Sequence, residues 1–212
     1  MSKNNVSHQK VIILIVFIIA ALVTSLFLFH LRNEQKPLLS NDNVTLFNVA
    51  RHLKDFDLQD GSGKPFTQRE LRDHWTLLFF GFTHCNSVCP TTLDMLARAY
   101  KELKPLYPNL QVVLVSVDPE RDNMQSLAAY TKQYHDDFIG ITGKQQALRK
   151  LQSQLGIYAE KETRADDKSY QVQHSSSILL LNPHGQWTGS IRYGLTPAEF
   201  ITTFKESMTA FT

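Results

Sequence analysis

Both cysteines of this 212-residue chain lie in one short stretch, residues 83–90, which reads THCNSVCP. Three residues separate Cys85 from Cys89, one more than in the Cys-x-x-Cys pair of common disulfide exchangers. Two neighbouring thiols can exchange disulfides with a partner, and two thiolates can bind a soft metal ion. A structural disulfide would close a very small loop, which gains little stability by chain entropy. The spacing therefore favours redox exchange or metal binding.

The elements expected on either side of the cysteines favour the thiolate form. Residues 75–82, WTLLFFGF, form a continuous apolar run, as expected of a strand buried on both faces. Residues 90–103 carry apolar side chains on one helical face, and Pro90 suits the first helical position. The free N–H groups at a helix start are equivalent to roughly +0.5 charge. Cys89 falls at or beside the cap position, and these groups would stabilise the thiolate form of both cysteines.

A metal held by two sulfurs normally needs a third ligand, and the chain contains eight histidines. His84 adjoins Cys85, but adjacent side chains often point apart. His174 precedes the apolar run SSILLL at residues 176–181, and in a thioredoxin-like fold the loop entering this strand lies beside the cysteine-bearing helix start. The residues alone leave His174 open between a structural role and a metal ligand. The remaining histidines are expected at the surface or beside the apolar N-terminal segment: His8, His30, His52, His74, His135 and His184.

The order of elements predicts an α/β, thioredoxin-like fold, with a central mixed sheet flanked by helices. We expect a hairpin at 56–67, a strand at 75–82, a helix at 90–103, a strand at 111–118, a helix from Asp122, a hairpin at 176–193 and a last helix opening at Thr196. Asp122 with Gln125, and Thr196 with Glu199, have the spacing of capping boxes.

Residues 11–29, VIILIVFIIAALVTSLFLF, contain no charged residue. At ~1.5 Å per residue this run can span a ~30 Å hydrocarbon core, whereas the apolar core of a cleaved signal peptide is usually ~7–15 residues. We therefore expect an uncleaved N-terminal transmembrane helix. Lys3 and Lys10 precede it without an acidic residue, which favours a cytoplasmic N-terminus by the positive-inside rule.

The chain is accordingly divided into four parts: residues 1–10 as a short cytoplasmic N-terminus, 11–31 as the transmembrane anchor, 32–50 as a polar tether and 51–212 as the thioredoxin-like domain. The leader lacks the Arg- and Ser-rich character of an organelle transit peptide. We expect a single-pass protein of the bacterial inner membrane with its soluble domain in the periplasm. The balance of 22 basic and 20 acidic residues, scattered along the chain, excludes nucleic acid as an expected partner.

Three stretches resemble the SCO/SenC copper-chaperone family: GFTHCNSVCPTTL at 81–93, VSVDPERD at 115–122, and YQVQHSS with LLLNPHG between 170 and 185. The resemblance covers roughly residues 53–210. It implies a membrane-held thioredoxin-like domain that binds one copper ion through two cysteines and a distal histidine. The family serves maturation of the binuclear copper centre of cytochrome c oxidase, by delivering copper, by reducing the recipient's cysteines, or by both.

Transferred onto this sequence, the family's copper ligands fall on Cys85, Cys89 and His174. Asp118 falls on the aspartate of VSVDPERD, for which we expect a role in turn formation and capping. Gln173 stands where the family commonly has aspartate, and it can replace only the hydrogen bonding of that carboxylate. Asn-Ser-Val stands between the cysteines in place of a frequent Pro-Asp-Val. Both departures leave the three implied ligands in place.

The favoured hypothesis is a metallochaperone rather than an enzyme, with one Cu(I) ion per chain held by Cys85, Cys89 and His174. The same ligands could hold Cu(II) or zinc. The alternative is a thiol–disulfide oxidoreductase in which Cys85 attacks and Cys89 resolves, and a third hypothesis is a copper or redox sensor. The expected partners are the copper-bearing subunit of cytochrome c oxidase, other copper carriers or thiol–disulfide exchange proteins, and the membrane through residues 11–31.

Overall fold

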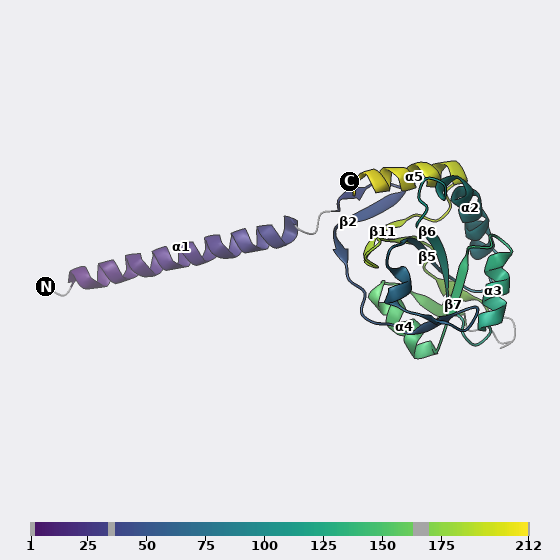
Figure 1. The fold of residues 1–212 in the computed structure, drawn as a ribbon. Coiled ribbons are helices and arrows are strands. Elements are labelled where there is room, and N and C mark those ends of the chain that lie inside the picture. The colour runs from purple at the N-terminus through teal and green to yellow at the C-terminus, as the bar shows by residue number, and fades with distance from the viewer. Residues whose placement is uncertain (1–2, 34–36, 163–169, 212) are drawn as a thin grey trace. The chain divides into compact units, whose positions relative to one another are not determined.

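The computed structural model describes residues 3–33, 37–162 and 170–211, and the chain forms two compact units, Met1–Pro37 and Leu38–Thr212. Helix α1 (Lys3–Asn33) makes up the first unit (Figure 1). Its large apolar side chains between Ile12 and Leu28 are exposed, Phe17 by 70%. Among the described residues, no helix has the length and hydropathy of a membrane span. The anchor predicted for residues 11–31 is therefore not confirmed.

The second unit is built on a mixed sheet with strand order β1-β2-β11-β10-β5-β6-β7-β3-β4 in the described part of the chain. Its strands are β1 (Leu39–Ser40), β2 (Val44–Arg51), β3 (Leu58–Asp60), β4 (Pro65–Phe66), β5 (Trp75–Gly81), β6 (Leu110–Ser116), β7 (Ile139–Thr142), β10 (Ile178–Leu181) and β11 (Trp187–Ile191). Strands β5, β6 and β7 are parallel and the other pairs are antiparallel. The predicted α/β fold with a central mixed sheet is confirmed.

Helices pack around this sheet, and a short 3-10 helix, η1 (Gln68–Leu71), leads into β5. The helices are α2 (Val88–Leu103), α3 (Met124–Lys132), α4 (Gln145–Gln154) and α5 (Pro197–Thr209). Figure 1 shows α2 and α5 side by side, and the two helices are in contact. The predicted cap of the last helix is confirmed, because the Thr196 hydroxyl and the Glu199 carboxylate form a reciprocal capping box.

The two central parallel strands position the cysteine stretch. Every residue of β6 and all but the first of β5 are buried, as expected of parallel strands covered on both faces. Their register pairs Gly81 with Ser116, and the N–H of Val117 donates to the Gly81 carbonyl at 2.9 Å. The two segments that leave the sheet here, THCNSVCP after β5 and DPERD after β6, therefore start side by side.

The tether predicted for residues 32–50 is wrong from Leu38 onward. Strand β2 pairs with β11, and β1 pairs with β2, so this segment belongs to the second unit. Within β2, Val44 and Leu46 are buried while the residues between and after them are more exposed. This alternation gives the segment a core-facing side that a solvated linker lacks.

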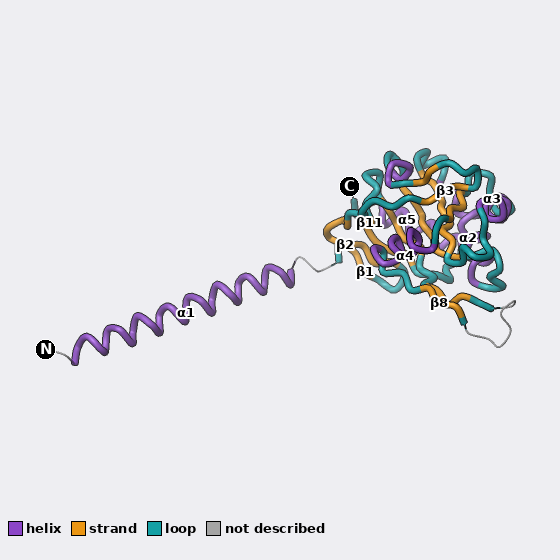
Figure 2. Tube along the Cα trace, turned by 90° about the horizontal axis from the view of Figure 1, so that it is seen from below, coloured by secondary structure: helices purple, strands orange, loops and turns teal. Residues whose placement is uncertain are grey.

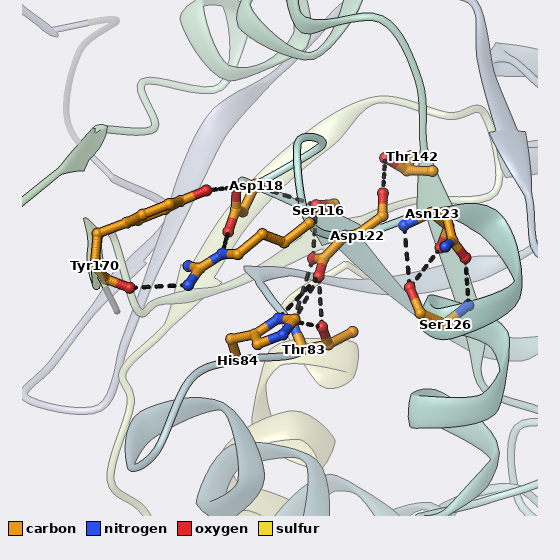
Figure 3. Close-up of polar contacts among 10 residues, drawn as sticks. Thr83, His84, Ser116, Asp118, Asp122, Asn123, Ser126, Thr142 and Tyr170 are labelled. Carbon is orange, nitrogen blue, oxygen red and sulfur yellow. Dashed lines mark hydrogen bonds and ion pairs between the residues drawn. The ribbon is translucent and has the colours of Figure 1, made fainter. Parts of the chain in front are cut away.

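The capping box predicted at Asp122 and Gln125 is also wrong. Helix α3 begins one residue later than expected, with Asn123 and Ser126 capping each other's backbone (Figure 3). Asp122 is only 1% exposed, and its carboxylate accepts hydrogen bonds from residues outside the helix. A carboxylate occupied in this way cannot cap the helix.

A separate two-stranded antiparallel ribbon consists of β8 (Ala159–Lys161) and β9 (Val172–His174). The register pairs Ala159 with His174 and Lys161 with Val172. Figure 2 shows β8 projecting at the margin of the unit. His174 is therefore carried by the ribbon rather than by the central sheet.

Candidate metal centre

The structure brings Cys85, Cys89 and His174 together, although 85 positions separate the last two. One ligand atom from each side chain lies within 4.8 Å of the others, and Sγ of Cys89 is 3.6 Å from Nε2 of His174. Both cysteines are free thiols. Among the described residues, these three are the group of His, Cys, Asp or Glu side chains whose spacing could hold a metal ion.

Each member comes from a different local structure. Cys85 lies in the turn after β5, where its N–H donates to the Phe82 carbonyl at 3.3 Å. Cys89 lies in the first turn of α2, and it is fully buried. His174 ends strand β9 of the ribbon. The three donors therefore depend on the docking of the ribbon against the start of α2.

The start of α2 stabilises a thiolate at Cys85. The Cys89 side chain donates a hydrogen bond to the Cys85 sulfur, and this contact is the largest cause that lowers the pKa of Cys85, to about 3. The N–H groups of Ser87 and Cys89 lower it further, against the opposing effect of burial. The Cys89 N–H lies 3.4 Å from the Cys85 sulfur. The expectation of thiolates at the helix start is thus met at Cys85 but is wrong for Cys89, whose pKa is raised.

Cys89 has the opposite character. Its hydrogen bond to Cys85 and its burial both raise the pKa of the Cys89 thiol far above the ordinary value. Without metal, the pair therefore shares one proton, held on Cys89. Metal binding through both sulfurs would release that proton, because thiolate rather than thiol is the ligand.

The tautomer of His174 is fixed by its neighbour. Nδ1 lies 3.0 Å from the carbonyl oxygen of Ser175, which can only accept a hydrogen bond, so Nδ1 carries the proton. Nε2 then presents a lone pair on the side of Cys89. The rings of Phe79 and Phe82 pack edge-on against the imidazole, with centroids at 6.1 and 5.9 Å. This arrangement suits a metal-ligating histidine.

Gln173 faces away from the ligand histidine along the strand. Successive side chains of a strand point to opposite faces. The Gln173 side chain is exposed, and its Nε2 donates to Oε1 of Glu162 at 3.0 Å. The departure from the family's aspartate therefore changes a contact within the ribbon, and Glu162 keeps a carboxylate in the cleft beside the site.

His84 does not join the metal-binding group. Its Nδ1 lies 2.9 Å from the Thr83 hydroxyl and 3.9 Å from the Asp122 carboxylate, and the side chain is 53% exposed (Figure 3). The expectation that adjacent side chains point apart holds for His84 and Cys85.

Asp122 was missed as a part of the site's framework. Its carboxylate accepts hydrogen bonds from the N–H and the hydroxyl of Thr83, at 3.2 and 2.6 Å, and from the Ser116 hydroxyl at 2.8 Å (Figure 3). Burial raises the pKa of this carboxyl. These bonds hold the turn that leads to Cys85 against the end of β6. The signal in the sequence was its place as the last residue of VSVDPERD, which follows a buried strand.

A cleft of about 780 Å³ opens beside the three donors. Cys85 is partly exposed to it, whereas Cys89 is buried. Its lining combines residues of the cysteine turn with residues of the ribbon: Phe82, Cys85, Asn86, Ser87, Val88, Glu162, Gln171, Val172, Gln173, His174 and Ser176. A partner's side chain can therefore reach Cys85 first.

The donor set fits one copper ion. Two sulfurs and one imidazole nitrogen are soft to intermediate ligands, which suit Cu(I) at low coordination number. A structural zinc site almost always has four protein ligands. Within the described residues the group contains three, so copper fits better than structural zinc.

Proteins similar to this chain also include copper-binding ones. The model of the SCO1/SenC family matches residues 47–209. A candidate copper-binding protein of Stutzerimonas stutzeri is 37% identical over 162 residues, which cover 75% of this chain and 78% of that protein. The mitochondrial SCO2 homolog of Mus musculus is 32% identical over 159 residues, or 74% of this chain but only 62% of the homolog. The copper-bound crystal structure of Arabidopsis thaliana ScoI aligns with a TM-score of 0.69 and 30% identity, covering 74% of this chain and 97% of ScoI.

Proposed function

Because the chain belongs to the SCO1/SenC family, we propose that it is a copper-binding metallochaperone that acts in the assembly of cytochrome c oxidase. The observation that carries the proposal is the convergence of two free sulfurs and the unprotonated Nε2 of His174 within 4.8 Å. Copper-bound relatives such as ScoI support the choice of metal.

Copper is the cargo in this proposal, and Cys85 and Cys89 play different parts in holding and releasing it. Cys85 is a thiolate before the ion arrives, whereas Cys89 must lose its proton on binding and regain one on release. A recipient thiolate approaching through the cleft would replace Cys85 before Cys89, because Cys85 is the more exposed sulfur. Exchange of one ligand at a time keeps the ion coordinated throughout transfer.

Thiol–disulfide exchange is a second candidate function, favoured by the unequal exposure of the two sulfurs. The Cys85 thiolate would attack one sulfur of a partner's disulfide and expel the other as a thiolate. Cys89, after losing its proton, would then attack the Cys85 sulfur and release the partner's second thiolate. The partner gains two electrons, and this protein is left with a Cys85–Cys89 disulfide that an external thiol must reduce.

The proposed setting is the bacterial inner membrane, with residues 11–31 as a single-pass anchor and the second unit in the periplasm. A helix that exposes apolar side chains around its whole surface needs an apolar environment, and α1 exposes Ile12, Phe17 and Phe27 by 60%, 70% and 61%. Sedimentation with membranes after alkaline washing, and protease access to the second unit in spheroplasts, test this placement.

The function is tested by the copper content of the purified full chain and by oxidase activity in cells that lack it. We expect about one copper per chain and an oxidase defect that added copper relieves. A copper-free protein would contradict the metallochaperone. An unchanged oxidase would contradict the assembly role and favour the sensor hypothesis. A defect relieved by an added thiol reductant, but not by copper, would favour the oxidoreductase.

A further inference from the structure

The strand that carries His174 is held in place by side chains rather than by the sheet. Strand β9 pairs with β8, and within the described residues neither strand joins the nine-stranded sheet. The hydrogen bonds of the central sheet therefore do not hold β9 directly. Contacts between the ribbon and the body of the domain must do so.

Tyr170 makes two of these contacts. It is 7% exposed and lies two residues before β9 begins. Its hydroxyl donates to Oδ1 of Asp118 at 2.7 Å, and its carbonyl oxygen accepts a hydrogen bond from Nη1 of Arg121 at 3.0 Å. Figure 3 shows Tyr170 reaching across to Asp118, which lies in the segment after β6.

Arg121 completes the arrangement. Its Nε donates to Oδ2 of Asp118 at 2.5 Å, and its guanidinium carbon lies 3.6 Å from the centroid of the Tyr170 ring. Since Asp118 is only 2% exposed, this ion pair is shielded from water and is stronger than a surface pair. The guanidinium also lies 5.7 Å from the ring of Phe82, which itself packs against His174. We name Tyr170, Asp118 and Arg121 the ribbon latch.

The other strand of the ribbon is tied to the same turn. Lys161 of β8 pairs with Glu120, and its Nζ lies 4.3 Å from the centroid of the Tyr170 ring. Both charged groups are largely exposed, so this pair contributes less than the latch. The turn that holds the ribbon starts beside the cysteine turn, because β5 and β6 end together. The segment after β6 thus holds the ribbon next to the two cysteine sulfurs.

We propose that the ribbon latch positions the His174 imidazole against Cys85 and Cys89 and thereby sets how fast copper leaves the site. This inference rests on the proposed copper-binding function. Opening the latch would let β9 and His174 move away while both sulfurs stay at the start of α2. The ion would then lose its nitrogen ligand first and become accessible to a recipient.

Tyr170→Phe tests the latch by removing one hydroxyl and keeping the ring. Tyr158→Phe is the matched control, since the Tyr158 hydroxyl bonds to Glu160 of the ribbon and not to the body. In the metal-free full chain, we expect amide hydrogen exchange at residues 172–174 to rise about tenfold in Tyr170→Phe, as for loss of a hydrogen bond to a charged acceptor. Exchange in β5 should stay unchanged, and Tyr158→Phe should match the unmodified protein.

A second measurement follows transfer of Cu(I) from the loaded full chain to a competing chelator. Release should be about tenfold faster from Tyr170→Phe than from Tyr158→Phe. Arg121→Lys, which keeps the charge but loses the guanidinium fork, should fall between them and replaces Tyr170→Phe if that variant does not fold.

Unchanged exchange at residues 172–174 would overturn the inference, and so would an equal rise in β5, which would show a general loss of stability. Faster exchange with unchanged copper release would also overturn it. If neither the unmodified chain nor the control binds copper, the proposed function fails, while the exchange data still decide whether the latch positions the ribbon.

Discussion

Nε2 of His174 lies 3.6 Å from Sγ of Cys89, and the proton on Nδ1 is held by the Ser175 carbonyl. The imidazole is therefore already in the tautomer that a metal requires. Cys89, by contrast, still carries the proton that a metal must displace. The nitrogen ligand can therefore bind a metal ion without losing a proton, whereas the second sulfur cannot.

His174→Ala should weaken Cu(I) binding by at least about a hundredfold, because a three-ligand site would become a two-sulfur site. His84→Ala is the matched control, since that histidine lies beside Cys85 but outside the metal-binding group. Competition against a Cu(I) chelator measures both variants. Equal affinities in the two variants would remove His174 from the site. Thiol–disulfide exchange should survive both substitutions.

Alkylation of Cys85 in the metal-free protein should hardly depend on pH between about 5 and 8, because only a group with a pKa far below the usual ~8.5 stays fully ionised there. The lowered pKa of Cys85, about 3, means that the reactive thiolate persists until the solution is strongly acidic. Iodoacetamide labelling with mass spectrometry separates Cys85 from Cys89, which should stay unreacted. A tenfold fall in rate per pH unit below 8 would contradict the thiolate.

Asp122→Ala should lower the free energy of unfolding by about 3 kcal/mol, because it leaves the donors of half-buried Thr83 and buried Ser116 without their acceptor. Asp94→Ala is the control, since that side chain is 57% exposed and pairs with Arg98 on the surface of α2. Its cost should be under about 1 kcal/mol. Urea unfolding of the metal-free proteins gives both values. Equal costs would show that the Asp122 network adds nothing.

Gln173→Asp, which restores the family's common residue, should change Cu(I) affinity by no more than about threefold, as for a change of one exposed charge. The side chain at this position is exposed and contacts Glu162 across the ribbon rather than the imidazole. Gln171→Asp is the matched control, because Gln171 lies two residues before Gln173 and directly precedes β9. The same chelator competition applies, and a tenfold or larger gain from Gln173→Asp alone would show that the carboxylate acts on the metal site.

The central part of the fold follows from local pattern, because each signal lies in consecutive residues. The apolar run of β5 and the helical face of α2 place the cysteines correctly, and Thr196 with Glu199 gives the cap of α5. The tether was mispredicted because polar residues in 32–50 concealed the short alternation that buries Val44 and Leu46.

The framework of the site was harder to predict, because it depends on contacts between distant residues. Asp122 resembles a helix cap in sequence, but burial beneath Thr83 gives it another role. Asp118 was expected to form a turn, and its carbonyl does accept two turn hydrogen bonds. Its carboxylate, however, binds Tyr170, 52 positions away. No local pattern specifies that pairing.

The location of His174 on a detached ribbon has a consequence for the polypeptide as a whole. An ion held by Cys89 and His174 would cross-link two points 85 positions apart and so restrict the unfolded chain, as a removable disulfide would. The bound ion would then stabilise the fold of the protein that carries it. Release of copper would therefore lower the stability of the fold, and binding of the next ion would restore it.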